Sequence, residues 1–248
     1  MKKALISVED LSMGYGETAL LEHASFEVAR GDVFVILGGS GCGKSTLLRH
    51  LIGLETPMAG RIRVAGEAPS LEGAAPRYGV MFQSGALFSS MSVGENVAFA
   101  LQEWTHLPLE AVDAIVRAKL ALVGLEGAED KLPAELSGGM RKRAAIARAM
   151  AFEPTLIFLD EPSAGLDPVS AVELDELILA LNRNLGLTVV MVTHELESIF
   201  KVGKTCIMLD RETRSIIARG EPKRLRTESA DPKVRRFFNR ETSVPQWQ

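Results

Sequence analysis

The phosphate-binding pattern G-x-x-x-x-G-K-[ST] is matched at every fixed position by Gly38-Gly39-Ser40-Gly41-Cys42-Gly43-Lys44-Ser45-Thr46. The five residues before it, 33–37, are apolar and mostly β-branched, which predicts a short buried strand. The residues after it, 47–52, carry apolar side chains at helical spacing. Strand, glycine-rich loop and helix in this order are the context of a P-loop, so we expect an α/β fold.

The residue types of this loop fit the chemistry of phosphate binding. Glycine lets the backbone curl so that successive N–H groups point inward and form a nest for phosphate oxygens at the start of a helix. Lys44 would reach the β- and γ-phosphates, and Ser45 offers a hydroxyl to a Mg2+ ion that keeps several of its waters. The alternative is a glycine-rich turn before a helix, which the flanking segments make the weaker interpretation.

Length and composition narrow the possible classes of protein. The 248 residues suffice for one large domain or for a domain with a smaller insert. A net charge of -4 argues against a nucleic-acid-binding protein. Residues 1–10 do not resemble a signal peptide, and the sequence has no apolar run long enough to cross a bilayer, so we expect a soluble cytoplasmic protein. Cys42 and Cys206 are too few for a disulfide framework or a metal site.

The segments before residue 78 predict an antiparallel β edge beside the P-loop strand. Residues 5–11 alternate well enough for a strand, 19–28 predict further short strands, and 61–64 another. Tyr15 lies between two glycines ahead of the P-loop, where its ring could stack on an adenine or could be an ordinary turn residue.

Three later segments predict buried strands that end in polar side chains. Residues 78–82 lead to Gln83, and 187–193 lead to His194. Ligands of α/β sheets bind at the carboxyl ends of strands, so both residues are site candidates. Gln83 could instead be an ordinary loop residue, and a lone histidine is usually structural. We favour His194 as a γ-phosphate contact because it follows a strand of the same predicted sheet.

The third such strand, residues 155–159, ends in the carboxylates Asp160 and Glu161. An apolar strand buried on both faces is typical of a parallel sheet, and charges at its end are costly unless they have a function. Asp160 is placed to hold Mg2+ through its waters, and Glu161 to polarise the water that attacks the γ-phosphate. A helix cap could explain one of these carboxylates but not both.

Residues 91–150 change in character to predominantly helical. A capping-box pattern begins at Ser92, and 109–123 has apolar residues at helical spacing. The segment ends with Ser137 and two glycines before the Ala/Arg-rich run 141–149, which predicts a second anion site at a helix start. The basic residues of that run could equally be a solvated helix face. We further expect a helix over 169–185 and a hairpin over 205–218.

These features together resemble the ATPase subunit of an ATP-binding cassette (ABC) transporter along essentially the whole chain. Proteins of this family have a RecA-like core, an antiparallel β edge and an inserted helical subdomain. The signature motif distinguishes them from other P-loop proteins. Six motifs occur in the family's order: the aromatic A-loop residue Tyr15, the Walker A loop Gly38 to Thr46, the Q-loop residue Gln83, the signature Leu136-Ser137-Gly138-Gly139-Met140, the Walker B strand Leu156-Ile157-Phe158-Leu159-Asp160-Glu161 and the switch residue His194.

The resemblance implies binding and hydrolysis of ATP with Mg2+. The expected catalytic residues are Lys44, Gln83, Glu161 and His194, and the expected Mg2+ ligands are Ser45, Gln83 and Asp160. The signature would act on the nucleotide of a second subunit, with Asp167 near the seam between the two. The expected nucleotide-binding residues are Tyr15, Gly38, Gly39, Ser40, Gly41, Cys42, Gly43, Lys44, Ser45, Thr46, Ser137, Gly138, Gly139 and Asp167.

Three details resemble one subgroup, the ATPases of MCE-type lipid transporters, also called Mla systems. Met140 stands where most family members have glutamine, and the serine and glycines before it are intact. The segments Gln83-Ser84-Gly85-Ala86-Leu87-Phe88 and Asp231-Pro232-Lys233-Val234-Arg235-Arg236-Phe237-Phe238 also look like this subgroup.

The resemblance also implies an assembly. We expect a homodimer of ATPase subunits on the cytoplasmic face of a bacterial inner membrane, with an integral membrane permease and an MCE-domain protein, and no nucleic acid. A permease helix would dock around residues 83–96. Within a single ABC domain, 1–88 and 151–220 would form the core with its β edge, 89–150 the helical subdomain and 221–248 a C-terminal extension. Phe237, Phe238 and Trp247 of this extension either dock on the partner chain or pack on their own domain.

The leading hypothesis is therefore an ATPase that drives phospholipid transport between the inner and outer membranes. An ATPase of an importer for small solutes such as amino acids would share all of this chemistry. A soluble ABC protein that acts on DNA or the ribosome is a remote alternative, because such proteins usually carry a long coiled coil or two cassettes. Here the insert between Gln83 and Ser137 is short, and there is one P-loop.

Overall fold

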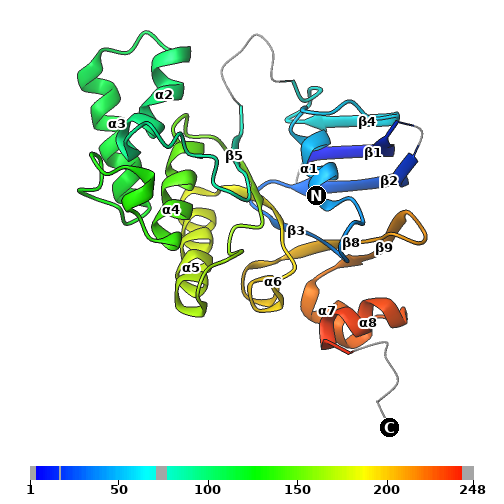
Figure 1. Ribbon diagram of the computed structural model, residues 1–248. Coiled ribbons are helices and arrows are strands. Elements are labelled where there is room, and N and C mark those ends of the chain that lie inside the picture. Colours follow the sequence, from blue (N-terminus) through cyan, green and yellow to red (C-terminus); the bar gives the residue numbers. More distant parts are fainter. Residues whose placement is uncertain (1–3, 17, 71–76, 242–248) are drawn as a thin grey trace.

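The computed structural model describes residues 4–16, 18–70 and 77–241, which fold into two β-sheets with helices packed around them (Figure 1). The smaller sheet is antiparallel, with the order β2-β1-β4. Its strands are β1 (Ala4–Tyr15), β2 (Thr18–Ala29) and β4 (Ala59–Val64). The predicted antiparallel β edge is therefore confirmed as a separate three-stranded sheet.

β1 and β2 are longer than the sequence predicts, because each continues through irregularities in the pairing. In β1 the register shifts between Val8 and Leu11, where Asp10 takes a φ of 49°, and in β2 it shifts between Leu21 and Ala24, where His23 takes a φ of 51°. Such a bulge breaks the alternation of apolar and polar residues but lets the strand bend and continue. The interpretation of 19–28 as several short strands was wrong for this reason.

The larger sheet carries the P-loop strand at its centre. Its order is β5-β6-β7-β3-β8-β9, and every pairing is parallel except that of β8 with β9. Its strands are β3 (Val33–Gly38), β5 (Gly79–Met81), β6 (Leu156–Asp160), β7 (Thr188–Val192), β8 (Thr205–Asp210) and β9 (Ser215–Gly220). The predicted buried strands and the final hairpin are present, and the carboxyl ends of β5, β6, β7 and β3 form one continuous edge.

A group of helices follows β5 and precedes β6 in the sequence, and it lies to one side of the larger sheet (Figure 1). It consists of α2 (Val93–Trp104), α3 (Leu109–Leu122), a short 3-10 helix (Pro133–Glu135) and α4 (Gly138–Ala149). The predicted capping box at the start of α2 is formed: Ser92 Oγ accepts from the N–H of Glu95, and a Glu95 carboxylate oxygen accepts from the N–H of Ser92.

The remaining helices follow or precede strands of the larger sheet. α1 (Lys44–Leu51) follows β3 directly, and α5 (Pro168–Leu185) and α6 (Leu196–Val202) stand before and after β7. α7 (Pro222–Glu228) and α8 (Pro232–Asn239) close the described chain. Within residues 4–16, 18–70 and 77–241, no helix has the length and apolar character needed to cross a bilayer.

The core consists of two hydrophobic clusters, and β3 contributes to both. Val33, Val35 and Leu37 belong to the cluster that includes α2 to α6, whereas Phe34 and Ile36 belong to the cluster with α1 and the smaller sheet. A strand covered on both faces must be apolar throughout, which explains the uninterrupted apolar run before the P-loop.

The end of the described chain packs on its own subunit. Phe238 is buried, and its ring lies 5.6 Å from that of Phe200 on α6 and 5.3 Å from that of Phe237. Of the two interpretations of these aromatic residues, packing on the same domain holds for Phe237 and Phe238. Trp247 lies outside the described residues.

Gly38 is the last residue of β3, and both its backbone conformation and the lack of room for a Cβ atom require glycine. Its φ is 146°, and a Cβ atom there would lie 2.5 Å from Cys42 Sγ and 2.6 Å from the carbonyl oxygen of Leu209 on β8. Gly39 is different, since its φ is not in the left-handed region and a Cβ atom would meet nothing within 4 Å.

Gly38→Ala is therefore expected to lower the free energy of unfolding by at least about 2 kcal/mol, because backbone atoms of β8 cannot move aside cheaply. Gly39→Ala is the matched control and should stay within about 1 kcal/mol of the unmodified protein. Urea unfolding curves of the three proteins measure this. Equal stabilities of the two variants would contradict the geometry at Gly38.

Asp175 on α5 is a buried carboxylate at the contact with α6. It is 3% exposed, and its Oδ2 accepts a 2.9 Å hydrogen bond from Ser198 Oγ. Burial raises its pKa above the ordinary value; the Ser198 hydrogen bond and the charge of Lys201 act in the opposite direction, and the charge of Glu176 adds to the rise. The folded state thus binds the Asp175 proton more tightly than the unfolded state does.

Asp175→Asn should consequently stabilise the protein, and more so as pH rises. The unfolded carboxyl ionises first, so the folded protein loses stability from about the ordinary pKa up to the raised folded pKa. The amide of Asn does not ionise, so the variant does not lose stability in this pH range, and its oxygen can still accept the hydrogen bond from Ser198. Thermal melts between about pH 4 and about pH 7 measure the difference, with the exposed Asp113→Asn as control. A gain that shrinks with rising pH would contradict this account.

Candidate active site

The P-loop joins β3 to α1 through positions that need glycine. Gly38, Gly41 and Gly43 have positive φ values, and Gly39, Ser40 and Gly41 form an exposed crest. Gly43 is the N-cap of α1 and supplies no side-chain oxygen, so side-chain caps do not occupy the first N–H groups of the helix. These groups and the helix dipole favour an anion at this position.

The Lys44 side chain folds back onto the first two residues of the loop. Its Nζ donates hydrogen bonds of 2.9 Å to the carbonyl oxygen of Gly38 and 3.0 Å to that of Gly39. These bonds hold the ammonium group beside the loop crest, as a phosphate-binding lysine requires.

Cys42 contributes backbone rather than its thiol to this loop. The side chain is 2% exposed and belongs to the cluster under α1. Burial raises the pKa of the thiol, and the nearby Lys44 charge only partly opposes this effect. The thiol is therefore a packing group in the protonated form.

Ser45 and Asp160 meet at the ends of α1 and β6. Ser45 Oγ donates to Asp160 Oδ1 over 3.2 Å. Burial raises the pKa of Asp160, the Ser45 hydrogen bond lowers it, and the charge of Glu161 raises it further. A hydroxyl and a carboxylate are hard oxygen donors, and the cost of burying Asp160 would fall beside a cation, so this pair fits Mg2+.

Glu161 and His194 form a pair at the ends of β6 and β7. His194 Nδ1 lies 2.9 Å from Glu161 Oε1, and the imidazole is largely exposed. Glu161 is 8% exposed, and within the described residues its buried Oε2 has no hydrogen-bond partner. Its φ of 47° is a conformation that costs a non-glycine residue on the order of 1 kcal/mol. A strained residue with a free buried oxygen is typical of a site where that oxygen serves a ligand.

Gln83 follows β5, the strand beside β6. Its side chain is exposed, whereas its carbonyl oxygen accepts a 2.6 Å hydrogen bond from Lys142 Nζ on α4. Sequence reasoning missed this lysine, because it stands in a run of basic residues that resembles a solvated helix face.

Tyr15 ends β1 beside the helix that follows the P-loop. Its hydroxyl oxygen lies 2.9 Å from Thr46 Oγ1 and accepts a 3.3 Å hydrogen bond from Arg49 Nη1. The side chain is 52% exposed. An exposed ring held next to the phosphate loop suits stacking on a base more than a simple turn role.

The signature turn packs against the turn that contains Asp167. Ser137 is exposed and caps α4, with its Oγ accepting from the N–H of Met140. A Cβ atom on Gly138 would lie 3.2 Å from Leu166, and one on Gly139 would lie 3.4 Å from Ser170. Small residues are thus needed for this contact.

Asp167 caps α5, with its Oδ1 accepting from the N–H groups of Val169 and Ser170. Hydrogen bonds from Ser170 lower the pKa of this carboxyl. Among the described residues, no hydrogen bond joins Ser137, Gly138 or Gly139 to residues 38–46. The fold thus gathers the candidate residues into two sets, the strand ends around the P-loop and the signature turn with Asp167.

Comparison with known proteins places these sets in a family. A model of the ABC transporter family matches residues 21–164. The intermembrane phospholipid transport system ATP-binding protein MlaF of Escherichia coli is 40% identical over 241 residues, which cover 95% of this chain and 88% of MlaF. MlaF of Haemophilus influenzae is 38% identical over 99% of this chain and 94% of its own length.

A further relative is longer than this chain. The probable ribonucleotide transport ATP-binding protein mkl of Mycobacterium tuberculosis is 40% identical over 240 residues. The match covers 94% of this chain and 66% of mkl.

Solved structures show the same architecture. The cbiO1 protein of Clostridium perfringens, part of the ABC transporter complex cbiONQ, aligns over 92% of both chains with a TM-score of 0.81 and 30% identity. The dimeric ATP-binding cassette MJ0796 bound to ADP and Pi aligns over 87% of this chain and 98% of its own, with a TM-score of 0.76 and 26% identity. Fold, family match and relatives agree, and this chain belongs to the ABC transporter family as a nucleotide-binding ABC ATPase domain.

Proposed function

We propose that this chain is the ATP-hydrolysing subunit of a phospholipid transporter. The observation that carries the ATPase part is the convergence of Lys44, Asp160, Glu161 and His194 at the carboxyl ends of adjacent parallel strands. A phosphate nest, a cation-binding pair and a buried carboxylate with a free oxygen are together the groups that phosphoryl transfer to water requires.

ATP binding is assigned to the P-loop and Tyr15. The N–H groups of residues 38–46 would hold the α- and β-phosphates, and Lys44 would exchange its carbonyl partners for β- and γ-phosphate oxygens. The exposed ring of Tyr15 would stack on the adenine. Ser45, Asp160 and Gln83 would hold Mg2+, which when bound screens the phosphate charge and orients the γ-phosphate.

Hydrolysis is assigned to Glu161 as general base. Its free Oε2 would accept the proton of a water molecule whose oxygen attacks the γ-phosphorus, while the bond to the β-phosphate oxygen breaks and ADP leaves. His194 would hold Oε1 through Nδ1 and present its exposed edge to the γ-phosphate. Gln83 would orient the attacking water from the neighbouring strand.

The site becomes complete in a homodimer. Ser137, Gly138 and Gly139 would contact the γ-phosphate held by the P-loop of the partner, and Asp167 would lie at the seam. Ser137 is exposed, and it forms no hydrogen bond with the P-loop of its own chain within the described residues. The dimeric state of the MJ0796 cassette supports this arrangement.

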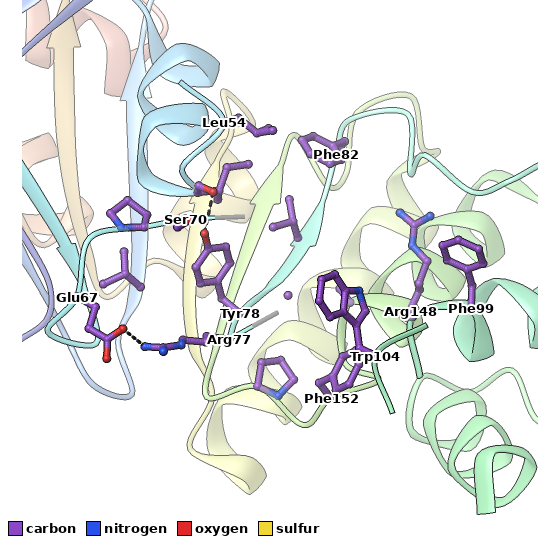
Figure 2. Close-up of a pocket in the computed structure, with 18 of the residues that line it drawn as sticks. Leu54, Glu67, Ser70, Arg77, Tyr78, Phe82, Phe99, Trp104, Arg148 and Phe152 are labelled. Atoms are coloured by element: carbon purple, nitrogen blue, oxygen red, sulfur yellow. Dashed lines mark hydrogen bonds and ion pairs between the residues drawn. The ribbon is translucent and has the colours of Figure 1, made fainter. Parts of the chain in front are cut away.

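Docking of the permease is assigned to a groove of about 580 Å3 that is lined by residues of β5 and α2 and by the segments that follow α1 and β4. Figure 2 shows its wall: Tyr78 and Phe82 come from the β5 segment, and Phe99 and Trp104 from α2. Phe99 and Trp104 are exposed although they are large and apolar. An apolar groove beside Gln83 fits an amphipathic permease helix, which would link transport to the site.

The proposal that the cargo is a phospholipid rests on the names of the relatives. MlaF proteins of two organisms, each named for intermembrane phospholipid transport, match at least 95% of this chain. Met140, residues 83–88 and residues 231–238 are the motif details that agree with this subgroup. An MCE-domain protein is the expected further partner, and the inner face of the bacterial inner membrane is the expected location.

The test is to tag the protein, extract native membranes in mild detergent and identify what copurifies. A permease with an MCE-domain protein and bound phospholipid is the expected result. A periplasmic solute-binding protein would favour the small-solute importer and contradict lipid transport. Recovery with ribosomes or DNA in the soluble fraction would contradict a transporter altogether.

Glu161→Gln should keep ATP binding but lower the rate of hydrolysis by at least about 100-fold, because the amide cannot accept the proton. The closed dimer should then accumulate in ATP. Glu197→Gln, an exposed substitution on α6, is the control. The measurements are phosphate release, equilibrium ATP binding and size-exclusion chromatography. Turnover near the unmodified rate would remove Glu161 as the base.

Asp160→Asn should raise the Mg2+ concentration needed for half-maximal hydrolysis by about tenfold, because the amide oxygen is a weaker ligand than a carboxylate. Titration of hydrolysis with Mg2+ at saturating ATP measures this, and chelation with EDTA should stop the unmodified enzyme. An unchanged Mg2+ requirement in the variant would show that Asp160 is not part of the metal site.

A further inference from the structure

Lys142 is a buried cation between the signature turn and the catalytic carboxylates. It stands on α4 five residues after Ser137 and is 8% exposed. Its neighbours behave differently, since Arg141 donates to the carbonyl oxygen of Leu136 and Arg143 pairs with Glu173 on α5. Arg148, later in the run, also reaches the segment after β5 and donates to the carbonyl oxygens of Gly85 and Ala86. Lys142 contacts the segments after both β5 and β6.

The contacts of Lys142 join three segments that are far apart in sequence. Its Nζ donates a 2.6 Å hydrogen bond to the carbonyl oxygen of Gln83 and a longer one, of 3.4 Å, to that of Glu161. The first carbonyl belongs to the segment after β5, and the second to the segment after β6. The ammonium therefore bridges the backbones of the two segments from α4.

The Lys142 ammonium is hydrogen-bonded to two carbonyl oxygens but forms no ion pair within the described residues. Burial lowers its pKa below the ordinary value, and the charges of Asp160 and Glu161 oppose this shift only in part. A buried ammonium is costly, so its two carbonyl partners are needed to offset the loss of water. An uncharged side chain of similar length would avoid the desolvation cost but leave two carbonyl oxygens without this donor.

We propose that Lys142 is a positioning residue, which fixes the backbones of Gln83 and Glu161 relative to each other and links both to the signature helix. The proposal rests on the proposed ATPase function. It goes beyond that function because Lys142 touches no substrate atom itself. It acts through the two residues that contact the attacking water.

The backbone of Glu161 shows why such a support is needed. Its φ of 47° is unfavourable, and hydrogen bonds hold it on both sides. Its N–H donates to the carbonyl oxygen of Val192 over 2.9 Å, and its own carbonyl oxygen accepts from the N–H of Ala164 over 3.2 Å and from Lys142 Nζ over 3.4 Å. Without Lys142 the Glu161 carbonyl keeps the Ala164 bond but loses its link to α4 and Gln83, so we expect the strained residue to relax and Oε2 to move away from the attacking water. A displacement of α4 when Ser137 engages the partner's nucleotide would reach Glu161 through the same side chain.

The experiment compares Lys142→Met, which removes the donor at similar length, with Lys142→Gln, which keeps a neutral donor. The control is Lys119→Met, because Lys119 is also 8% exposed but pairs with Glu153, away from the strand ends. For each protein, kcat for MgATP hydrolysis, the equilibrium Kd for ATP and the thermal midpoint are measured.

We expect kcat of Lys142→Met to fall by about tenfold or more while the Kd for ATP stays within about twofold, and Lys142→Gln to recover part of kcat. Lys119→Met should lower the thermal midpoint about as much as Lys142→Met does, but its kcat should stay at the value of the unmodified protein. If Lys142→Met retains kcat, or if its loss is matched by Lys119→Met, the positioning role is wrong. No hydrolysis by the unmodified protein, alone or with its permease, would instead overturn the proposed ATPase function.

Discussion

Parallel pairing within the larger sheet is the constraint on which the rest of this structure depends. β5, β6, β7 and β3 run in the same direction, so the segments after each of them emerge at one edge of the sheet. Residues as distant in sequence as Lys44 and His194 thereby reach the same region. The sheet can keep this edge in register because β3 is apolar on both faces and is covered by both core clusters.

Several polar and charged groups at this edge are partly or fully buried, which costs free energy. Burial raises the pKa of Asp160, and Glu161 Oε2 has no hydrogen-bond partner among the described residues. The buried Lys142 ammonium donates to the backbone carbonyl oxygen of Glu161. Such groups would weaken a purely structural core. Their presence at the strand ends fits a site whose charges are complemented by Mg2+ and phosphate.

Much of the fold could be predicted from the sequence because the deciding signals are local. The P-loop, the uninterrupted apolar strands and the cap at Ser92 depend on neighbouring residues alone. The bulged length of β1, the inward direction of Lys142 and the packing of Phe238 against Phe200 depend on distant contacts. The Asp175 bond to Ser198 is of the same kind, since nothing in the spacing distinguishes this carboxylate from the exposed ones around it.

The central claim is that a complete site needs two chains, and complementation tests it most directly. Lys44→Ala disables the P-loop and Ser137→Arg disables the signature, so each homodimer should fail to hydrolyse MgATP. A mixed dimer would contain one intact site, formed by the P-loop of one chain and the signature of the other. We predict that mixing the two variants restores hydrolysis. If the mixture stays inactive while each variant still folds and dimerises, the shared-site account is contradicted.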